Sequence, residues 1–61
     1  MRYEFRIRKT HPTGGAVSYE QVADNSTAEE RRYRVKRLTE MGFSPVLQQR
    51  EVGPWMDVEF P

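Results

Sequence analysis

The chain opens with a strict alternation of apolar and polar residues. Over residues 2–9, Tyr3, Phe5 and Ile7 alternate with charged side chains. Because successive side chains of a β-strand point to opposite faces of a sheet, this alternation predicts a half-buried strand. Its apolar side is expected to face a core and its arginine-rich side to face away from it.

A loop and a return strand are predicted next. Residues 11–15, His-Pro-Thr-Gly-Gly, favour a loop, because proline lacks an N–H donor and glycine adopts positive φ without steric cost. Residues 16–23 then fit a strand in which Val17 and Tyr19 share one face. The two strands together predict a β-hairpin whose loop is slightly longer than the tightest class.

Residues 27–41 are predicted to form a helix. A run of Asp-Asn-Ser-Thr, all residue types that favour helix starts, leads into this segment. Two capping boxes fit the spacing: Ser26 with Glu29, or Thr27 with Glu30.

Apolar residues at helical spacing form one stripe along this helix, and Gly42 and Phe43 mark its end. Glycine tolerates the positive φ that a helix stop often uses, and Phe43 supplies the hydrophobic contact that accompanies such a stop. The stripe, with Arg31 at its N-terminal end, comprises Ala28, Val35, Leu38 and Met41.

Two further strands are predicted after the helix. Val46, Leu47 and Val52 indicate a third strand over roughly residues 45–51. A Gly-Pro turn signal follows, and residues 55–60 alternate once more, which indicates a fourth strand.

Connection rules narrow the arrangement of these elements. A right-handed crossover of the helix over the first strand gives strand order 2-1-3-4 with antiparallel neighbours. The predicted fold class is therefore α+β: a two-layer ββαββ sandwich in which one helix, about residues 27–41, packs on a four-stranded antiparallel sheet. The whole chain, residues 1–61, is predicted to be a single small domain.

The two faces of this sheet are expected to differ in composition. The face under the helix is expected to carry Tyr3, Phe5, Ile7, Val17, Tyr19, Met56, Val58 and Phe60. The opposite, open face is expected to carry Arg2, Glu4, Arg6, Arg8, Ser18, Glu20, Trp55, Asp57 and Glu59.

Length and composition exclude most classes of protein. A chain of 61 residues, 36% of them apolar, suffices for one core and not two. No cysteine is present, which excludes disulfides, thiolate metal sites and cysteine nucleophiles. No apolar run approaches the roughly 18 residues of a membrane-spanning helix, and no signal peptide is recognisable. We therefore expect a cytoplasmic protein that makes no membrane contact.

The sequence contains no catalytic constellation, so we expect no enzyme activity, no cofactor and no metal. The single histidine, His11, falls in a loop and cannot alone form a zinc site. The Gly14-Gly15 pair lacks the lysine and the following helix start of a phosphate-binding loop.

Charge is nearly balanced, with ten Lys and Arg residues against nine Asp and Glu residues. Its distribution is uneven, because residues 1–11 carry a net charge of +3, residues 28–41 carry +2 and residues 42–61 carry −2. A total so close to zero gives no strong general attraction to nucleic acid.

The open face supplies the first candidate partner-binding group, Arg6, Arg8 and Trp55. Tryptophan and arginine are the residue types most enriched at interface hot spots, and the phase of Trp55 opposes that of the apolar residues around it. The alternative is a solvated face held together by cross-strand pairs of opposite charge.

The helix supplies the second candidate group, Arg32, Lys36 and Arg37, which would contact phosphates or an acidic protein surface. The alternative is a solubilising outer face in which Glu30 pairs with Arg34. Arg31 and Arg34 can also lay their aliphatic stems across the rim of the core.

The layout has a known counterpart. It consists of a hairpin over residues 2–23, the helix start Ala-Asp-Asn-Ser-Thr-Ala-Glu-Glu over residues 23–30, and the helix stop Met-Gly-Phe-Ser-Pro-Val over residues 41–46. It resembles the small hairpin–helix–strand modules of short phage and mobile-element reading frames, such as the small phage inhibitor of host RNA polymerase. The resemblance implies a free-standing protein that docks on a larger host machine.

The leading hypothesis is a non-enzymatic binding protein that modulates a larger protein partner, as a phage or mobile element would regulate a host machine. The alternative is a small nucleic-acid-binding domain that uses the basic helix or the arginine-rich first strand. A third hypothesis is a homodimer formed through the edge strands.

Overall fold

The computed structural model describes residues 3–51 and 53–59, and the structural statements that follow refer to these residues. The predictions made for Arg2, Val52 and Phe60 lie outside the described residues.

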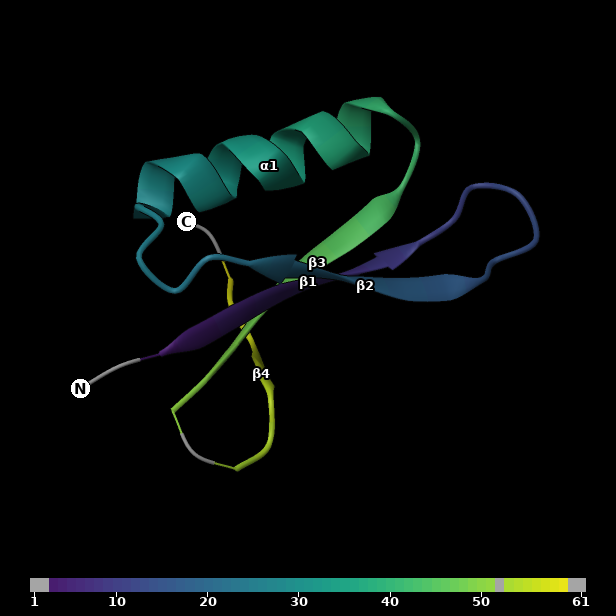
Figure 1. Ribbon diagram of the computed structural model, residues 1–61. Coiled ribbons are helices and arrows are strands. Elements are labelled where there is room, and N and C mark those ends of the chain that lie inside the picture. Colours follow the sequence, from purple (N-terminus) through teal and green to yellow (C-terminus); the bar gives the residue numbers. More distant parts are fainter. Residues whose placement is uncertain (1–2, 52, 60–61) are drawn as a thin grey trace.

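Five elements follow one another in the predicted order (Figure 1). They are strands β1 (Glu4–Thr10) and β2 (Val17–Val22), helix α1 (Ala28–Glu40), and strands β3 (Ser44–Arg50) and β4 (Met56–Asp57). The strands form one sheet in the order β2-β1-β3-β4, and all neighbours are antiparallel. Figure 1 shows α1 on one side of this sheet, with no described segment covering the other side. The predicted α+β fold and strand order are confirmed.

The core lies between β1, β3 and α1. Phe5, Ile7, Leu47 and Leu38 are its buried side chains, and Ile7 is fully inaccessible to solvent. Half-buried apolar side chains surround them, namely Val22, Val35, Phe43 and Val58.

Several residues predicted to lie in this core are exposed instead, namely Tyr3, Ala28, Met41 and Met56. Met41 is the C-cap residue at which the helix ends, shortly before the chain enters β3. Met56 pairs with Gln49 in the short outermost strand.

The helix termini follow the predicted chemistry. Of the two capping boxes, the one formed is that of Thr27 and Glu30: the Glu30 N–H donates to Thr27 Oγ1 over 3.1 Å, and the Thr27 N–H donates to Glu30 Oε1 over 3.0 Å. At the other end Gly42 has a φ of 95°, and the Phe43 N–H donates to the Leu38 carbonyl over 3.0 Å. These bonds satisfy backbone groups that the helix itself leaves unpaired.

The hairpin closes at His11, whose N–H donates to the Ala16 carbonyl over 2.8 Å. From this closure the register places Tyr19 opposite Arg8 and Val17 opposite Thr10. Residues directly opposite each other share a face, so Val17 and Tyr19 lie on the side away from α1. The prediction that they meet the helix was wrong, because the loop closure and not the apolar character of β2 sets the register.

The same register overturns the prediction for Ser18 and Glu20, which lie on the helix side of the sheet and not on its open face. Glu20 there binds Arg34 of α1, whose Nη2 donates to Glu20 Oε1 over 2.6 Å. The expected pairing of Arg34 with Glu30 is therefore also wrong, since Glu30 is engaged in the helix cap. Arg31 does cover the rim of the core, with its guanidinium carbon 3.8 Å from the centroid of the Phe5 ring.

The fourth strand is shorter than predicted, with only Met56–Asp57 in place of residues 55–60. The Val58 N–H donates to the Leu47 carbonyl over 2.8 Å, which shows that the Leu47 backbone faces β4. Backbone direction alternates along a strand, so the next β3 residue that faces this side is Pro45. Proline has no N–H to donate, and the β3–β4 ladder therefore cannot continue past Leu47 as a regular ladder.

The Glu20–Arg34 contact predicts that stability falls in acid. The hydrogen bond from Arg34 lowers the pKa of Glu20 below its ordinary value of 4.5, and the Thr27 backbone N–H lowers that of Glu30 in the same direction. A carboxylate with a depressed folded-state pKa stabilises the fold above its unfolded-state pKa, and this contribution is lost as pH falls through the folded-state pKa.

Urea unfolding measured between about pH 6 and pH 3 should show this loss, and Glu20→Gln should be less stable at neutral pH with a shallower pH dependence. Glu40→Gln is the control, since the described residues include no hydrogen-bond or ion-pair partner for this exposed carboxylate. Parallel pH profiles for the wild type and Glu20→Gln would contradict the assignment.

Candidate functional site

The open face is the side of the sheet that points away from α1. Because directly opposed residues share a face, the strand registers assign its side chains. They are Glu4, Arg6, Arg8 and Thr10 from β1, Val17, Tyr19 and Gln21 from β2, Ser44, Val46, Gln48 and Arg50 from β3, and Asp57 from β4.

Arg6 lies between two aromatic rings at the centre of this face. Its guanidinium carbon is 4.2 Å from the centroid of the Tyr19 ring and 4.4 Å from that of Trp55. A second guanidinium, that of Arg50, lies 4.5 Å from the Trp55 ring. Such contacts are cation–π interactions, each worth roughly 0.5–2 kcal/mol depending on exposure. We call these four residues, Tyr19, Arg6, Trp55 and Arg50, the arginine–aromatic stack.

The buried side-chain amide of Gln48 holds the arginine–aromatic stack in place through a hydrogen bond to Arg6. Gln48 is only 5% exposed although it lies on the open face. Its Oε1 accepts from Arg6 Nε over 2.8 Å, and its Nε2 donates to Asp57 Oδ1 over 2.9 Å. Arg50 in turn donates to Glu4 Oε1 over 3.3 Å. A buried polar group that keeps its hydrogen bonds holds its partners in defined positions, so Arg6 is oriented before any ligand arrives.

The structure brings together some of the predicted site residues and separates others. Arg6 and Trp55 are in direct contact, and Arg8 lies two residues along the same strand on the same face. Arg8 is half-buried, and no described residue forms a side-chain hydrogen bond or ion pair with it.

Arg32, Lys36 and Arg37 are exposed on α1, which lies on the other side of the sheet (Figure 1). The two predicted groups therefore do not form one site.

Two members of the arginine–aromatic stack, Tyr19 and Arg50, and the amide that supports it, Gln48, were missed from the sequence. The signal for Tyr19 was the loop length, since closure of the hairpin at His11 and Ala16 puts Tyr19 opposite Arg8. No local signal marks Gln48, because its partners Arg6 and Asp57 lie far from it in sequence or in another strand.

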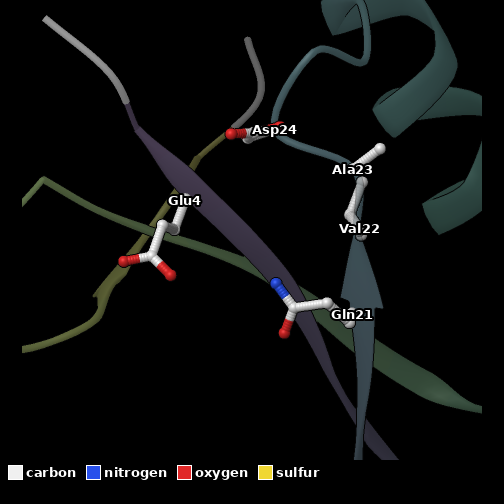
Figure 2. A pocket seen from close by; sticks show the side chains of 5 residues that line it. All are labelled: Glu4, Gln21, Val22, Ala23 and Asp24. Carbon is white, nitrogen blue, oxygen red and sulfur yellow. The ribbon is translucent and has the colours of Figure 1, made fainter.

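A shallow hollow lies at one end of the open face, where β1 begins and β2 ends. It is lined by Glu4, Gln21, Val22, Ala23 and Asp24 (Figure 2). The amide of Gln21 donates to the Phe5 carbonyl over 3.1 Å, and Glu4 is paired with Arg50. Figure 2 shows that the carboxylates of Glu4 and Asp24 do not converge on one point. The polar groups of the hollow are thus largely committed to other parts of the chain.

Over residues 3–51 and 53–59, no three acidic, histidine or cysteine side chains cluster as metal ligands would. The one described helix is too short and too polar to cross a bilayer. Comparison with family models, with curated proteins and with solved structures finds no match to this chain. The function must therefore be inferred from the site itself.

The stack predicts that Arg6→Lys will change the environment of Trp55, the only tryptophan in the chain. Lysine keeps the charge and loses the planar guanidinium that contacts both rings and the Nε donor to Gln48. We expect a red-shifted Trp55 emission with greater quenching by acrylamide, and a loss of roughly 1–3 kcal/mol in the free energy of unfolding.

The matched control is Arg8→Lys, on the same strand and face and without a described side-chain partner. If Arg6→Lys left Trp55 emission unchanged, or if both variants shifted it equally, Arg6 would not hold the indole as described.

Proposed function

We propose that this protein is a small non-enzymatic binding module that docks on a larger protein through its open face and thereby modulates that partner. The observation that supports this most strongly is the arginine–aromatic stack on a sheet face that no described element covers.

The stack has the composition and rigidity of an interface anchor. Tryptophan, tyrosine and arginine dominate binding energy at protein interfaces, and here Arg6 contacts both the Tyr19 ring and the Trp55 ring. Contacts that hold a side chain before binding reduce the conformational entropy lost on association. Tyr19 nevertheless remains 56% exposed and Val17 53% exposed, so the anchor still presents apolar area to a partner.

The charges on this face indicate the chemistry of the partner. The open face carries three cations, Arg6, Arg8 and Arg50, and two carboxylates, Glu4 and Asp57. Arg50 is paired with Glu4, and Arg6 is held by the stack, which leaves Arg8 as the cation with no described partner. A partner that places a carboxylate on Arg8 and apolar side chains on Tyr19 and Val17 fits best.

The basic residues of α1 take a different part in this proposal. Arg32, Lys36 and Arg37 are exposed on the side of the molecule away from the stack. Exposed charges of one sign mainly accelerate encounter with an oppositely charged partner and contribute little to the final affinity. We therefore assign these residues to steering.

Two exposed tyrosines allow a matched test of the docking face. A photo-crosslinking phenylalanine analogue replaces either Tyr19 on the open face or Tyr33 on α1, which is 63% exposed. In an extract of the source cells, position 19 should give a crosslinked partner that position 33 does not.

With the purified partner, Arg8→Glu should weaken binding at least roughly tenfold in calorimetry, because it sets two carboxylates against each other.

Arg37→Glu is the control and should change mainly the association rate and its salt dependence. Equal crosslinking from positions 19 and 33, or a loss of affinity in Arg37→Glu that exceeds the loss in Arg8→Glu, would move the docking surface to the helix and overturn the proposal.

A second candidate function is binding of single-stranded nucleic acid, and the exposed Tyr19 ring next to Arg8 on an antiparallel sheet favours it. Single strands bind by stacking bases on aromatic rings and by placing phosphates on basic side chains. The net charge of only +1 weighs against it.

A salt titration separates the two functions. Fluorescence anisotropy with labelled single-stranded RNA and DNA should show log affinity falling by roughly 0.7 per log unit of salt for each phosphate bound. Tyr19→Ala should then remove the stacking contribution. Lys36→Ala should weaken binding and lower the salt dependence only if the helix is the contact surface. No binding at low salt would dispose of this candidate.

A further inference from the structure

The free edge of β2 is a second interaction surface, distinct from the open face. β2 is the outermost strand of the order β2-β1-β3-β4. The hydrogen bond from His11 to the Ala16 carbonyl identifies this opposed pair as a bonded one. Bonded pairs alternate along an antiparallel ladder, so the β2 residues bonded to β1 are Ser18, Glu20 and Val22.

The backbone groups of the intervening residues point outward. The N–H and C=O of Val17, Tyr19 and Gln21 therefore face away from β1, along an edge of the sheet that has no described neighbouring strand. α1 packs most closely against β3 and reaches β2 through the Arg34–Glu20 ion pair, which involves side chains on the helix side of the sheet and not the outward backbone groups.

β2 also lacks the features that usually protect an edge strand. Natural sheets protect their edges with proline, with bulges, with unpaired charges or with very short strands. β2 has six residues without proline and an uninterrupted register. Its one charged residue, Glu20, is neutralised by Arg34 and Lys9. By contrast, the opposite edge strand β4 has two residues and follows Pro54.

We propose that β2 pairs antiparallel with β2 of a second copy of this chain, centred on Tyr19. In this register Tyr19 lies opposite Tyr19 of the second copy, and Val17 lies opposite Gln21. The outward-pointing residues then form three bonded pairs, each of which exchanges two hydrogen bonds. Every outward N–H and C=O of Val17, Tyr19 and Gln21 is satisfied.

The extent of β2 selects this register over its neighbours. With Tyr19 at the centre, Ser18 lies opposite Glu20 of the second copy, which brings a hydroxyl donor to a carboxylate. Moving the centre to Glu20 would place Val17 opposite Ala23, which lies beyond the end of β2. Moving it to Ser18 would leave Gln21 without a bonded counterpart among the three outward residues. The net charge of +1 adds little repulsion between copies.

Pairing through β2 would join the two open faces into one continuous surface with both Tyr19 rings near its centre. The dimer is inferred from the free edge of β2 and does not require the proposed function, but it would double the docking surface.

Sedimentation equilibrium from micromolar to millimolar concentration tests the proposal and should show a reversible monomer–dimer equilibrium. The sharpest variant carries an N-methyl group on the Tyr19 backbone nitrogen, introduced by chemical synthesis of the 61-residue chain. This change removes the outward donor and leaves the tyrosine side chain and the β1–β2 ladder in place. We expect the dimer dissociation constant to rise by roughly tenfold or more, since two hydrogen bonds are lost per dimer.

N-methylation of Thr13, in the exposed hairpin loop, is the matched control and should leave dimerisation unchanged. Amide hydrogen exchange supplies a second readout: Ser18, Glu20 and Val22 should be protected at every concentration, and Val17, Tyr19 and Gln21 only where the dimer forms. A chain that stays monomeric throughout, with the Tyr19 amide always unprotected, would overturn the proposal.

The outcomes separate this inference from the docking function. A dimer that binds no larger protein refutes the docking function and leaves the edge pairing intact. A monomer that gives a position-19 crosslink to a larger protein does the reverse. Crosslinks at position 19 to another copy of the chain are recognised by their mass.

Discussion

The alternation of β1 is the constraint on which the rest of the molecule depends. β1 pairs with β2 on one side and β3 on the other, so a slip of one residue would exchange its two faces across the sheet. Phe5 and Ile7 fix one face beneath α1 through their burial. Arg6, which lies between them in sequence, is thereby directed to the opposite side, where Tyr19 and Trp55 flank it. Apolar burial on one side of the strand thus positions the central cation of the candidate site on the other.

The candidate site and the attachment of the last strand share the same residues. Gln48 is bonded to Arg6 on one side and to Asp57 of β4 on the other, so loss of either bond would leave part of a buried amide unsatisfied. β4 is otherwise held by a ladder only two residues long. The arginine–aromatic stack therefore contributes to the fold as well as to the proposed interface. The side chains that hold β4 and those of the proposed docking surface are thus partly the same.

Features encoded by local signals could be predicted from the sequence. The helix needs only its capping residues and its apolar spacing, and Ala28–Glu40 lies within the predicted range with both termini as expected. The strand order followed from connection rules. The orientation of β2 could not be predicted from its apolar residues, because Val17 and Tyr19 take their side from the closure at His11 and Ala16. The arginine–aromatic stack was harder still, since it joins side chains from several segments that only the complete register brings together.

The proline in β3 has a consequence for how far the sheet can grow. Because Pro45 offers no N–H beyond the end of β4, the side of the molecule opposite β2 presents an interrupted row of backbone donors to any newcomer. Addition of strands is therefore favoured at one boundary only. A two-fold symmetric contact pairs the β2 edges of both copies with each other, so no free β2 edge remains to bind a third copy. Assembly through β2 would therefore stop at the dimer and would not extend into a fibre.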